Sequence, residues 1–416
     1  MATGEPSGTP LGAEIRLLLQ AGLAIFVFTV AVGILNGLDL IEFNREMLLA
    51  HVHAGALGWI TLGFLGASLW IFSEGRLLTG WSARAPRWLS YGAVASVVLY
   101  AVAFMLGNLN ARLAGGILTL LVVAGFFAWV VAQGRRIILS VAHLGMLAAM
   151  TTLTIGSILG VILGIWFKGG LKFLPEGIFT THPTTMVVGY LILAGMAISE
   201  WRLVPSNRPF TADRLGTMQV ILLFLAGLVL TVGALLNNIA IISANVPLEI
   251  AAMIIYVIRL GRRVARARWL DGGPERLYGA SAAFLVANVA LLTYLIVAVV
   301  TGAYGTPPDF SRIPPWLIFA MDHAMFIGVM TNALFALTAE ATWTQRARWP
   351  WADHLIFWGM NVGLVGFVVG LMQNSGALKQ IFTPIMGTGI LIGVITYTLR
   401  LQTGRPAAAT PEARSA

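Results

Sequence analysis

Twelve long apolar segments constrain this chain more than any other feature of its sequence. A helix needs about 20 mostly apolar residues to cross the bilayer core, and segments of this kind follow one another from residue 14 to residue 402. They are continuous rather than alternating, which argues against transmembrane strands. Only 10% of the residues are charged, against about 25% in soluble proteins. The sequence therefore predicts an all-α, polytopic membrane bundle of about twelve transmembrane helices.

The predicted boundaries divide the chain into one large domain and two tails. Residues 14–402 form a single twelve-helix transmembrane domain, residues 1–13 a cytoplasmic tail, and residues 403–416 a disordered cytoplasmic tail. Proline and glycine mark most of the breaks between spans, as at Pro86, whereas Asn237 and Asn238 alone mark the break after the seventh span. The expected spans begin near Glu14, Met47, Trp88, Ala114, Ile137, His182, Thr217, Ile239, Tyr278, Pro315, Ala352 and Leu378.

The distribution of basic residues predicts the orientation. Of the 26 lysines and arginines, 20 lie in the two termini and in the loops after even-numbered spans, and six lie in the other loops. The positive-inside rule then places both termini in the cytoplasm. Since the basic residues lie in loops between apolar segments, the net charge of +9 indicates topology rather than a nucleic-acid partner. The expected location is the inner (cytoplasmic) cell membrane, crossed many times, with the lipid bilayer as a partner.

The absence of cysteine restricts the cofactors that the chain can hold. The sequence contains no cysteine, which excludes disulfides, iron–sulfur clusters, thiolate haem ligands and covalently attached c-type haem. Histidine is therefore the ligand type to consider.

Four of the six histidines fall in the outer half of the membrane when the predicted topology is applied. His51 and His53 open the second span, His182 the sixth, and His323 lies about 12 Å into the tenth at 1.5 Å per residue. Ligand-type residues within a span indicate a functional site, and neutral imidazoles in an apolar layer suit metal or haem ligation. The other two, His143 and His354, lie near cytoplasmic helix ends, where packing or an interfacial position explains them.

The spacing of His51 and His53 separates their directions. Residues two apart on a helix point about 200° apart, so these two cannot ligate the same atom. Gly55, Gly58 and Gly66 share the side of His51 and would let a neighbouring helix or a flat macrocycle approach closely. His53 shares its side with apolar residues, including Leu57, Ile60 and Phe64, that could also line a haem pocket.

Three segments resemble the subunit I superfamily of haem–copper oxidases and nitric oxide reductases. HVHAGALGWITLGFLG, beginning at His51, resembles the family's second helix, where a histidine ligates the low-spin haem. His182-Pro183 resembles the His-Pro that supplies a copper ligand. MDHAMFIGVMTNALF resembles the family's His-x-His segment, with Met321 at the first histidine and His323 at the second, which is the other low-spin haem ligand.

The chain also departs from that family. The histidine pair of the seventh helix is missing, Met321 replaces the high-spin haem ligand, and Met186 occupies the usual tyrosine position. The binuclear centre therefore looks incomplete, and oxygen reduction to water by the usual route is not expected. A second resemblance is to the NnrS family, whose members are associated with haem, copper and nitric oxide tolerance, and which share an early His-x-His and a later His-Ala segment.

These resemblances imply a membrane protein that holds haem b. His323 and either His51 or His53 would ligate the iron, and the remaining histidine of the pair, with His182, would bind a second metal such as copper or hydrogen-bond a haem edge. The function implied is haem-dependent oxidoreduction: electron transfer, with a quinone or a cytochrome as donor, or binding or reduction of nitric oxide or oxygen. The haem propionates would need cationic partners on the outer side, and Arg312 and Lys379 are the first candidates. The other outer cations are Arg45, Arg112, Lys168 and Lys172.

Two other classes of protein stay open. A secondary transporter also has about twelve spans and often has broken helices at its midplane. A cofactor-free assembly subunit of a membrane complex is the third alternative. Visible absorption of the purified protein distinguishes haem from both.

Overall fold

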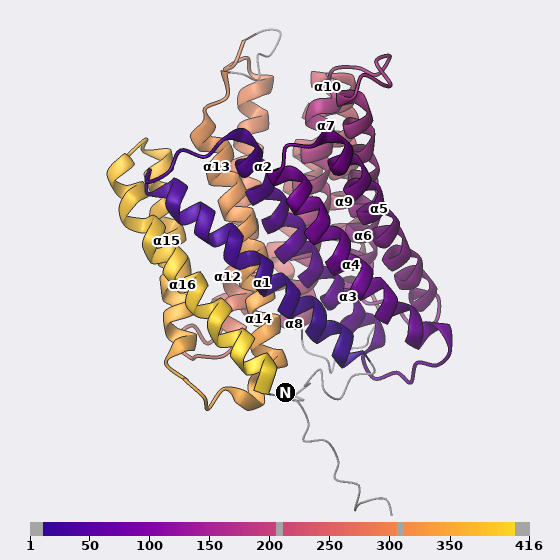
Figure 1. Ribbon diagram of the computed structural model, residues 1–416, viewed down its shortest axis with the longest axis vertical. Helices are drawn as coiled ribbons and strands as arrows, with labels where there is room; N and C mark the ends of the chain where they lie inside the picture. The colour runs from indigo at the N-terminus through magenta and orange to yellow at the C-terminus, as the bar shows by residue number, and fades with distance from the viewer. Residues whose placement is uncertain (1–10, 205–210, 306–311, 404–416) are drawn as a thin grey trace, which may run out of the picture.

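The computed structural model describes residues 11–204, 211–305 and 312–403, and these form an all-helical bundle (Figure 1). Twelve of its helical segments are long and apolar enough to cross a membrane, which confirms the predicted fold class. The first span begins and the last span ends at the same end of the bundle (Figure 1). We call this the inner end, because the charge pattern predicts that it faces the cytoplasm; the opposite end is the outer end. The predicted tails fall almost wholly outside the described residues.

Nine spans are single helices or helices with one short break, and three are helices with a π-helical middle. Spans 1 to 5 are α1 (Gly12–Gly37), α2-η2-α3 (Arg45–His53, Ala54–Thr61, Leu62–Ser73), α4 (Trp81–Met105), α5 (Leu109–Gly134) and α6 (Val141–Phe167). Spans 6 to 8 are α7-η3-α8 (Ile178–Thr184, Thr185–Leu191, Ile192–Leu203), α9 (Arg214–Leu236) and α10-α11 (Ile239–Ser243, Asn245–Ala265). Spans 9 to 12 are α12 (Glu275–Val300), α13-η5-α14 (Pro315–His323, Ala324–Thr331, Asn332–Ala341), α15 (Ala352–Met372) and α16 (Gly376–Thr403).

The prediction of a break at Pro86 was wrong, because α4 begins at Trp81 and runs through this proline. Proline has no backbone N–H, so it leaves the carbonyl four residues earlier without its helical partner. That carbonyl belongs to Ser82, and it accepts a hydrogen bond from the indole Nε1 of Trp129 at 3.0 Å. A side chain from α5 thus replaces the missing bond, and the helix continues.

The weakest predicted break, at Asn237 and Asn238, was correct. Asn237 adopts a left-handed conformation with φ of 49° after α9, a conformation that asparagine tolerates better than most residues. The Asn238 side chain then accepts hydrogen bonds from the backbone N–H groups of Ala240 and Ile241 and caps α10. The two asparagines therefore end one helix and begin the next.

Spans 2, 6 and 10 form the centre of the bundle. In the most apolar window of these spans 94%, 78% and 67% of residues are buried, against 33–50% in the other candidate spans among the described residues. Each central span also contains a π-helical segment. Such segments are rare in proteins, and those that occur are often found at functional sites. The segments begin directly after His53, directly after His323, and three residues after His182. The pattern recurs every four spans, a repeat that the sequence analysis did not detect.

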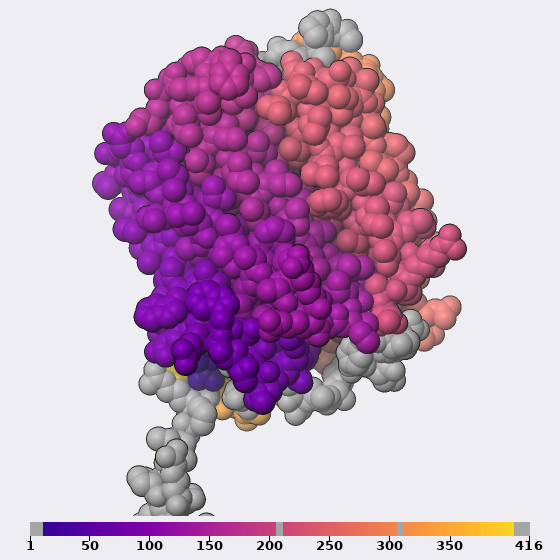
Figure 2. All heavy atoms as spheres, turned by 90° about the vertical axis from the view of Figure 1, so that its right-hand side faces the viewer, coloured from indigo at the N-terminus to yellow at the C-terminus, as the bar shows by residue number. Residues whose placement is uncertain are grey.

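The outer spans present an apolar surface suited to lipid. Figure 2 shows α4 to α6 in violet and magenta beside α9 to α12 in pink, packed into one continuous face. Large apolar side chains of α5, α6, α9 and α11 are exposed, including Leu121, Ile158, Ile221, Ile254 and Ile258. In water such a surface would favour aggregation, whereas in a bilayer it faces hydrocarbon.

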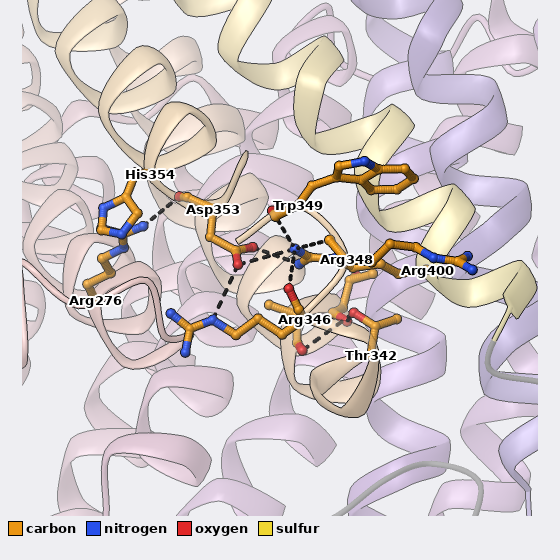
Figure 3. Close-up of polar contacts among 10 residues, drawn as sticks. Arg276, Thr342, Arg346, Arg348, Trp349, Asp353, His354 and Arg400 are labelled. Carbon is orange, nitrogen blue, oxygen red and sulfur yellow. Dashed lines mark hydrogen bonds and ion pairs between the residues drawn. The ribbon is translucent and has the colours of Figure 1, made fainter. Parts of the chain in front are cut away.

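At the inner end a buried ion pair joins the last two spans. Asp353 of α15 accepts from Arg400 of α16 at 2.7 Å, and the two residues are 5% and 1% exposed. Arg346 lies on the other side of the same carboxylate, at 3.4 Å (Figure 3). Arg400 also donates to the carbonyls of Arg348 and Trp349, and so fixes the loop between α14 and α15.

Candidate functional site

The two histidines of α2 face different neighbours, as their spacing predicts. His51 points toward α1, where its Cε1 lies 3.4 Å from the place that a Cβ on Gly33 would occupy, and its electrostatic partner is His323 of α13. His53 points toward α4, where its ring stacks on Phe104 with centroids 3.8 Å apart. Its electrostatic partners include His182 of α7. His51 is therefore within electrostatic range of His323 on span 10, and His53 within electrostatic range of His182 on span 6; we call these the two histidine pairs.

A hydrogen bond between spans 2 and 10 fixes the register of the first pair. The indole Nε1 of Trp59 donates to Thr331 at 3.1 Å, and these residues follow His51 and His323 by eight positions each. Both helices run in the same direction and both contain a π-helical segment over this interval. The bond therefore holds the two histidines at the same depth.

The second pair has the same arrangement. The hydroxyl of Tyr190 donates to Thr61 at 3.4 Å, and these residues follow His182 and His53 by eight positions. Phe64, one turn further along span 2, packs edge to face on Tyr190 with centroids 5.1 Å apart. Span 2 thus uses opposite sides to position one histidine against span 10 and the other against span 6.

Backbone contacts orient three of the four imidazoles. The Nδ1 atoms of His53 and His323 lie 2.8 and 2.7 Å from the carbonyl oxygens of Leu49 and Phe319, one turn earlier in each helix. The Nδ1 of His182 lies 2.9 Å from the carbonyl of Gly156 on α6. A carbonyl oxygen only accepts, so Nδ1 must carry the proton. In the neutral ring Nε2 then has a free lone pair, the form that binds a metal.

His51 differs from the other three. Its Nδ1 makes no hydrogen bond of standard geometry, although the ring interacts with the backbone of Thr29 on the facing part of α1; the hydroxyl of Thr29 is itself buried without a partner. Buried polar atoms without partners are uncommon and call for an explanation. At this position a bound metal ion or a hydrogen-bonding group would satisfy the ring nitrogen.

The glycines beside His51 serve helix packing. A Cβ on Gly55 would lie 3.1 Å from the Thr29 side chain, and one on Gly58 would collide with Ile25. Both contacts are with α1. Of the two partners that these glycines could admit, a neighbouring helix or a flat macrocycle, the structure shows the helix. A different glycine makes room for His182: a Cβ on Gly160 of α6 would lie 2.9 Å from the imidazole Cε1.

Among the cations near the outer end, Arg112 lies beside the pair formed by His53 and His182. Its guanidinium is 4.8 Å from the centroid of Phe104, the ring on which His53 stacks, and it interacts with His53. Its Nε is buried without a partner. Arg112 is one of the outer cations that the sequence offers as partners of haem propionates, and its contact with them stays a prediction.

Two other candidates, Lys379 and Arg312, are placed differently. Lys379 contacts Asp39 at 2.7 Å, and its hydrogen bond holds the pKa of that carboxyl below its usual range. Arg312 is exposed in the loop before α13. Their proposed contact with haem propionates stays a prediction.

No group of three or more histidine, cysteine, aspartate or glutamate side chains within the described ranges is arranged to hold a metal ion. The copper site expected from the resemblance, with His51, His53 and His182 as possible ligands, therefore lacks support. The inner histidines have structural contacts: His143 hydrogen-bonds Ser140 at 2.7 Å in the cap of α6, and the Nδ1 of His354 lies 3.3 Å from Arg276.

These features define a class: a multi-pass helical membrane protein with paired histidines between its central spans. No protein-family model matches the chain. It is similar to the ascorbate-specific transmembrane electron transporter 2 of Zea mays, with 31% identity over 222 residues, which cover 52% of this chain and 78% of the maize protein. Transporter 1 of the same species is 24% identical over 221 residues, with the same coverage. The chain belongs to the same family as these transmembrane electron transporters, and the similarity extends over about half of its length.

Proposed function

We propose that this protein carries electrons in the membrane through haem b held by His51 and His323. The observation that carries the proposal is the pairing of these two residues between spans 2 and 10, at one depth and with the Nε2 lone pair of His323 free. The relationship to transmembrane electron transporters supports the electron-transfer role. Haem would supply an iron that changes oxidation state by one electron without a proton.

The residues present suit haem better than an isolated metal ion. His51 and His323 would together hold a haem iron, for which two protein ligands are enough, whereas a structural metal site needs about four ligands. The π-helical segments after both histidines and the apolar surroundings also fit a flat macrocycle. His53 and His182 have the alternative roles that the sequence left open: ligands of a second metal such as copper, or hydrogen-bond donors to a haem edge.

The resemblance to haem–copper oxidase subunit I remains part of the proposal. The twelve spans and the histidines on spans 2 and 10 support it, whereas the absence of a third histidine near His53 and His182 does not support a copper site of the usual kind. Binding or reduction of nitric oxide or oxygen remains a prediction, because the maize relatives are described only as electron transporters. The assignment to the inner membrane likewise remains a prediction.

The donor is best identified by direct reduction. Purified protein should be mixed in turn with ascorbate, a quinol and a reduced soluble cytochrome, and the Soret and α bands followed with time. Ascorbate is included because the maize relatives are described as specific for it. Rapid reduction by one donor supports electron transport and names that donor. A colourless preparation with no haem would contradict the proposal and favour a transporter or an assembly subunit.

A further inference from the structure

A group of unsatisfied polar atoms lies between spans 6, 7 and 8, away from the histidine pairs. Five buried side-chain atoms on α8, α9 and α11 make no hydrogen bond of standard geometry among the described residues, although the Tyr256 hydroxyl interacts with Ser199 and the Glu249 carboxyl with Asn245. Native proteins pair such atoms with ordered water when no protein group is available. The five are Ser199 Oγ, Gln219 Nε2, Asn245 Oδ1, Glu249 Oε2 and the hydroxyl of Tyr256.

Glu249 is the chemically active member of this group. It lies ten residues into the span Ile239–Ala265, about 15 Å from its outer end, and is 1% exposed. Within the described ranges no cation is seen at its carboxyl; its side-chain partner is Asn245, which donates to the carbonyl of Ala226 at 3.1 Å. Burying an ionised carboxylate without a counter-charge is very unfavourable, so this site favours the neutral acid, which holds a proton.

Polar groups continue from Glu249 toward the inner end. Tyr256 lies two turns along the same side of α11, and its hydroxyl interacts with Ser199 of α8. One turn further, Arg259 holds Glu200 through two contacts of 2.7 and 2.8 Å. From Glu249 to Arg259 the helix rises about 15 Å.

The inner end of this series reaches water. Arg259 also contacts Asp213, at 3.2 Å, and the Asp213 side chain is 58% exposed. Beside them, Gln219 accepts from Arg259 at 3.2 Å while its own Nε2 has no partner. Carboxyl, hydroxyl and amide groups therefore lie between the surface and Tyr256, and water would have to bridge the last two turns of α11, about 10 Å, to Glu249.

We propose that these side chains and the water they bind form a proton route from the inner end to Glu249, which stores a proton within the membrane. A proton would pass by exchange along hydrogen bonds from water at Asp213, past Ser199 and Tyr256, to the carboxyl. No bond other than O–H changes, and no oxidant or reductant is required. If the proposed haem function holds, such a proton would balance the charge of an electron arriving in the bundle; the route itself does not depend on haem.

Infrared spectroscopy of the intact protein in lipid tests the route. The wild type should show the C=O stretching band of a protonated carboxylic acid that Glu249→Gln lacks, and this band should shift promptly on transfer to D₂O. Tyr256→Phe removes only one hydroxyl; it should keep the band but slow the shift at least about tenfold, which equals about 1.4 kcal/mol in the barrier. Tyr294→Phe, at an exposed tyrosine on α12, is the matched control and should exchange like the wild type.

Two results would overturn the proposal. If the band is missing in the wild type or persists in Glu249→Gln, Glu249 does not store the proton. If Tyr256→Phe exchanges as fast as the wild type, the proton does not pass along this series. Both measurements are made without any electron donor, so their failure is independent of the fate of the haem proposal.

Discussion

Trp59 and Thr331 hydrogen-bond across the centre of the bundle, and this bond lies eight residues beyond His51 and His323 on the same two spans. The hydroxyl of Thr331 is itself anchored, since it donates to the carbonyl of Phe326 at 2.8 Å. Both residues are fully buried. The pair therefore acts as a rigid reference from which the two histidines are placed.

Removing this hydrogen bond should make the relative position of His51 and His323 less fixed, while both histidines remain in place. Trp59→Phe keeps an aromatic ring but lacks the Nε1 donor, so we expect a loss of about 1 kcal/mol in unfolding free energy and a broadened low-spin spectrum. Thermal unfolding in detergent and the reduced spectrum measure the two effects. Trp88→Phe, at an exposed tryptophan, is the control and should change neither. Identical behaviour of both variants would mean that the bond does not position the histidines.

The ion pair at the inner end should matter for stability. Asp353→Ala leaves the buried guanidinium of Arg400 without its carboxylate, and breaking a buried pair from one side typically costs about 3–5 kcal/mol. The matched control is Asp271→Ala, because Asp271 pairs with Arg268 at 3.3 Å where both side chains are more than half exposed, and exposed pairs contribute about 0–1 kcal/mol. Thermal unfolding should separate the variants clearly; equal effects would refute a structural role for the buried pair.

The orientation can be tested with single cysteines, because the protein has none of its own. Arg263→Cys should react with an impermeant thiol reagent only from the cytoplasmic side, and Lys172→Cys only from the outside, as the charge asymmetry predicts. Labelling position 172 from the cytoplasm alone would invert the bundle. The histidine pairs would then lie near the cytoplasmic surface.

Much of the fold was predictable because membrane insertion makes length and hydrophobicity decisive. The starts at Ile239, Pro315 and Ala352 agree with the structure, since a cap or a proline marks each of them locally. The predicted start near Trp88 was seven residues late. The helix continues through Pro86 because Trp129, on another helix, donates to the carbonyl that the proline leaves without a partner. Local signals cannot reveal such a contact between spans.

The histidines of the candidate site were predictable, whereas their pairing was not. Helix geometry alone separates the directions of His51 and His53, and topology brings four histidines to one side. Which of the two meets His323 depends on the register between spans 2 and 10, which Trp59 and Thr331 fix. Glu249 was missed because a single acid in an apolar segment has no motif; only its burial without a cation distinguishes it.

Spectra of three histidine variants test the central claim most directly. Reduced-minus-oxidised difference spectra should be recorded for purified wild type, His51→Ala, His323→Ala and His53→Ala, each normalised to protein. The account predicts that His51→Ala and His323→Ala abolish the low-spin haem b signal, because each removes one axial ligand of the same iron. His53→Ala should retain it, since that ring faces span 6. Full haem content with an unchanged spectrum in His51→Ala or His323→Ala would contradict the account.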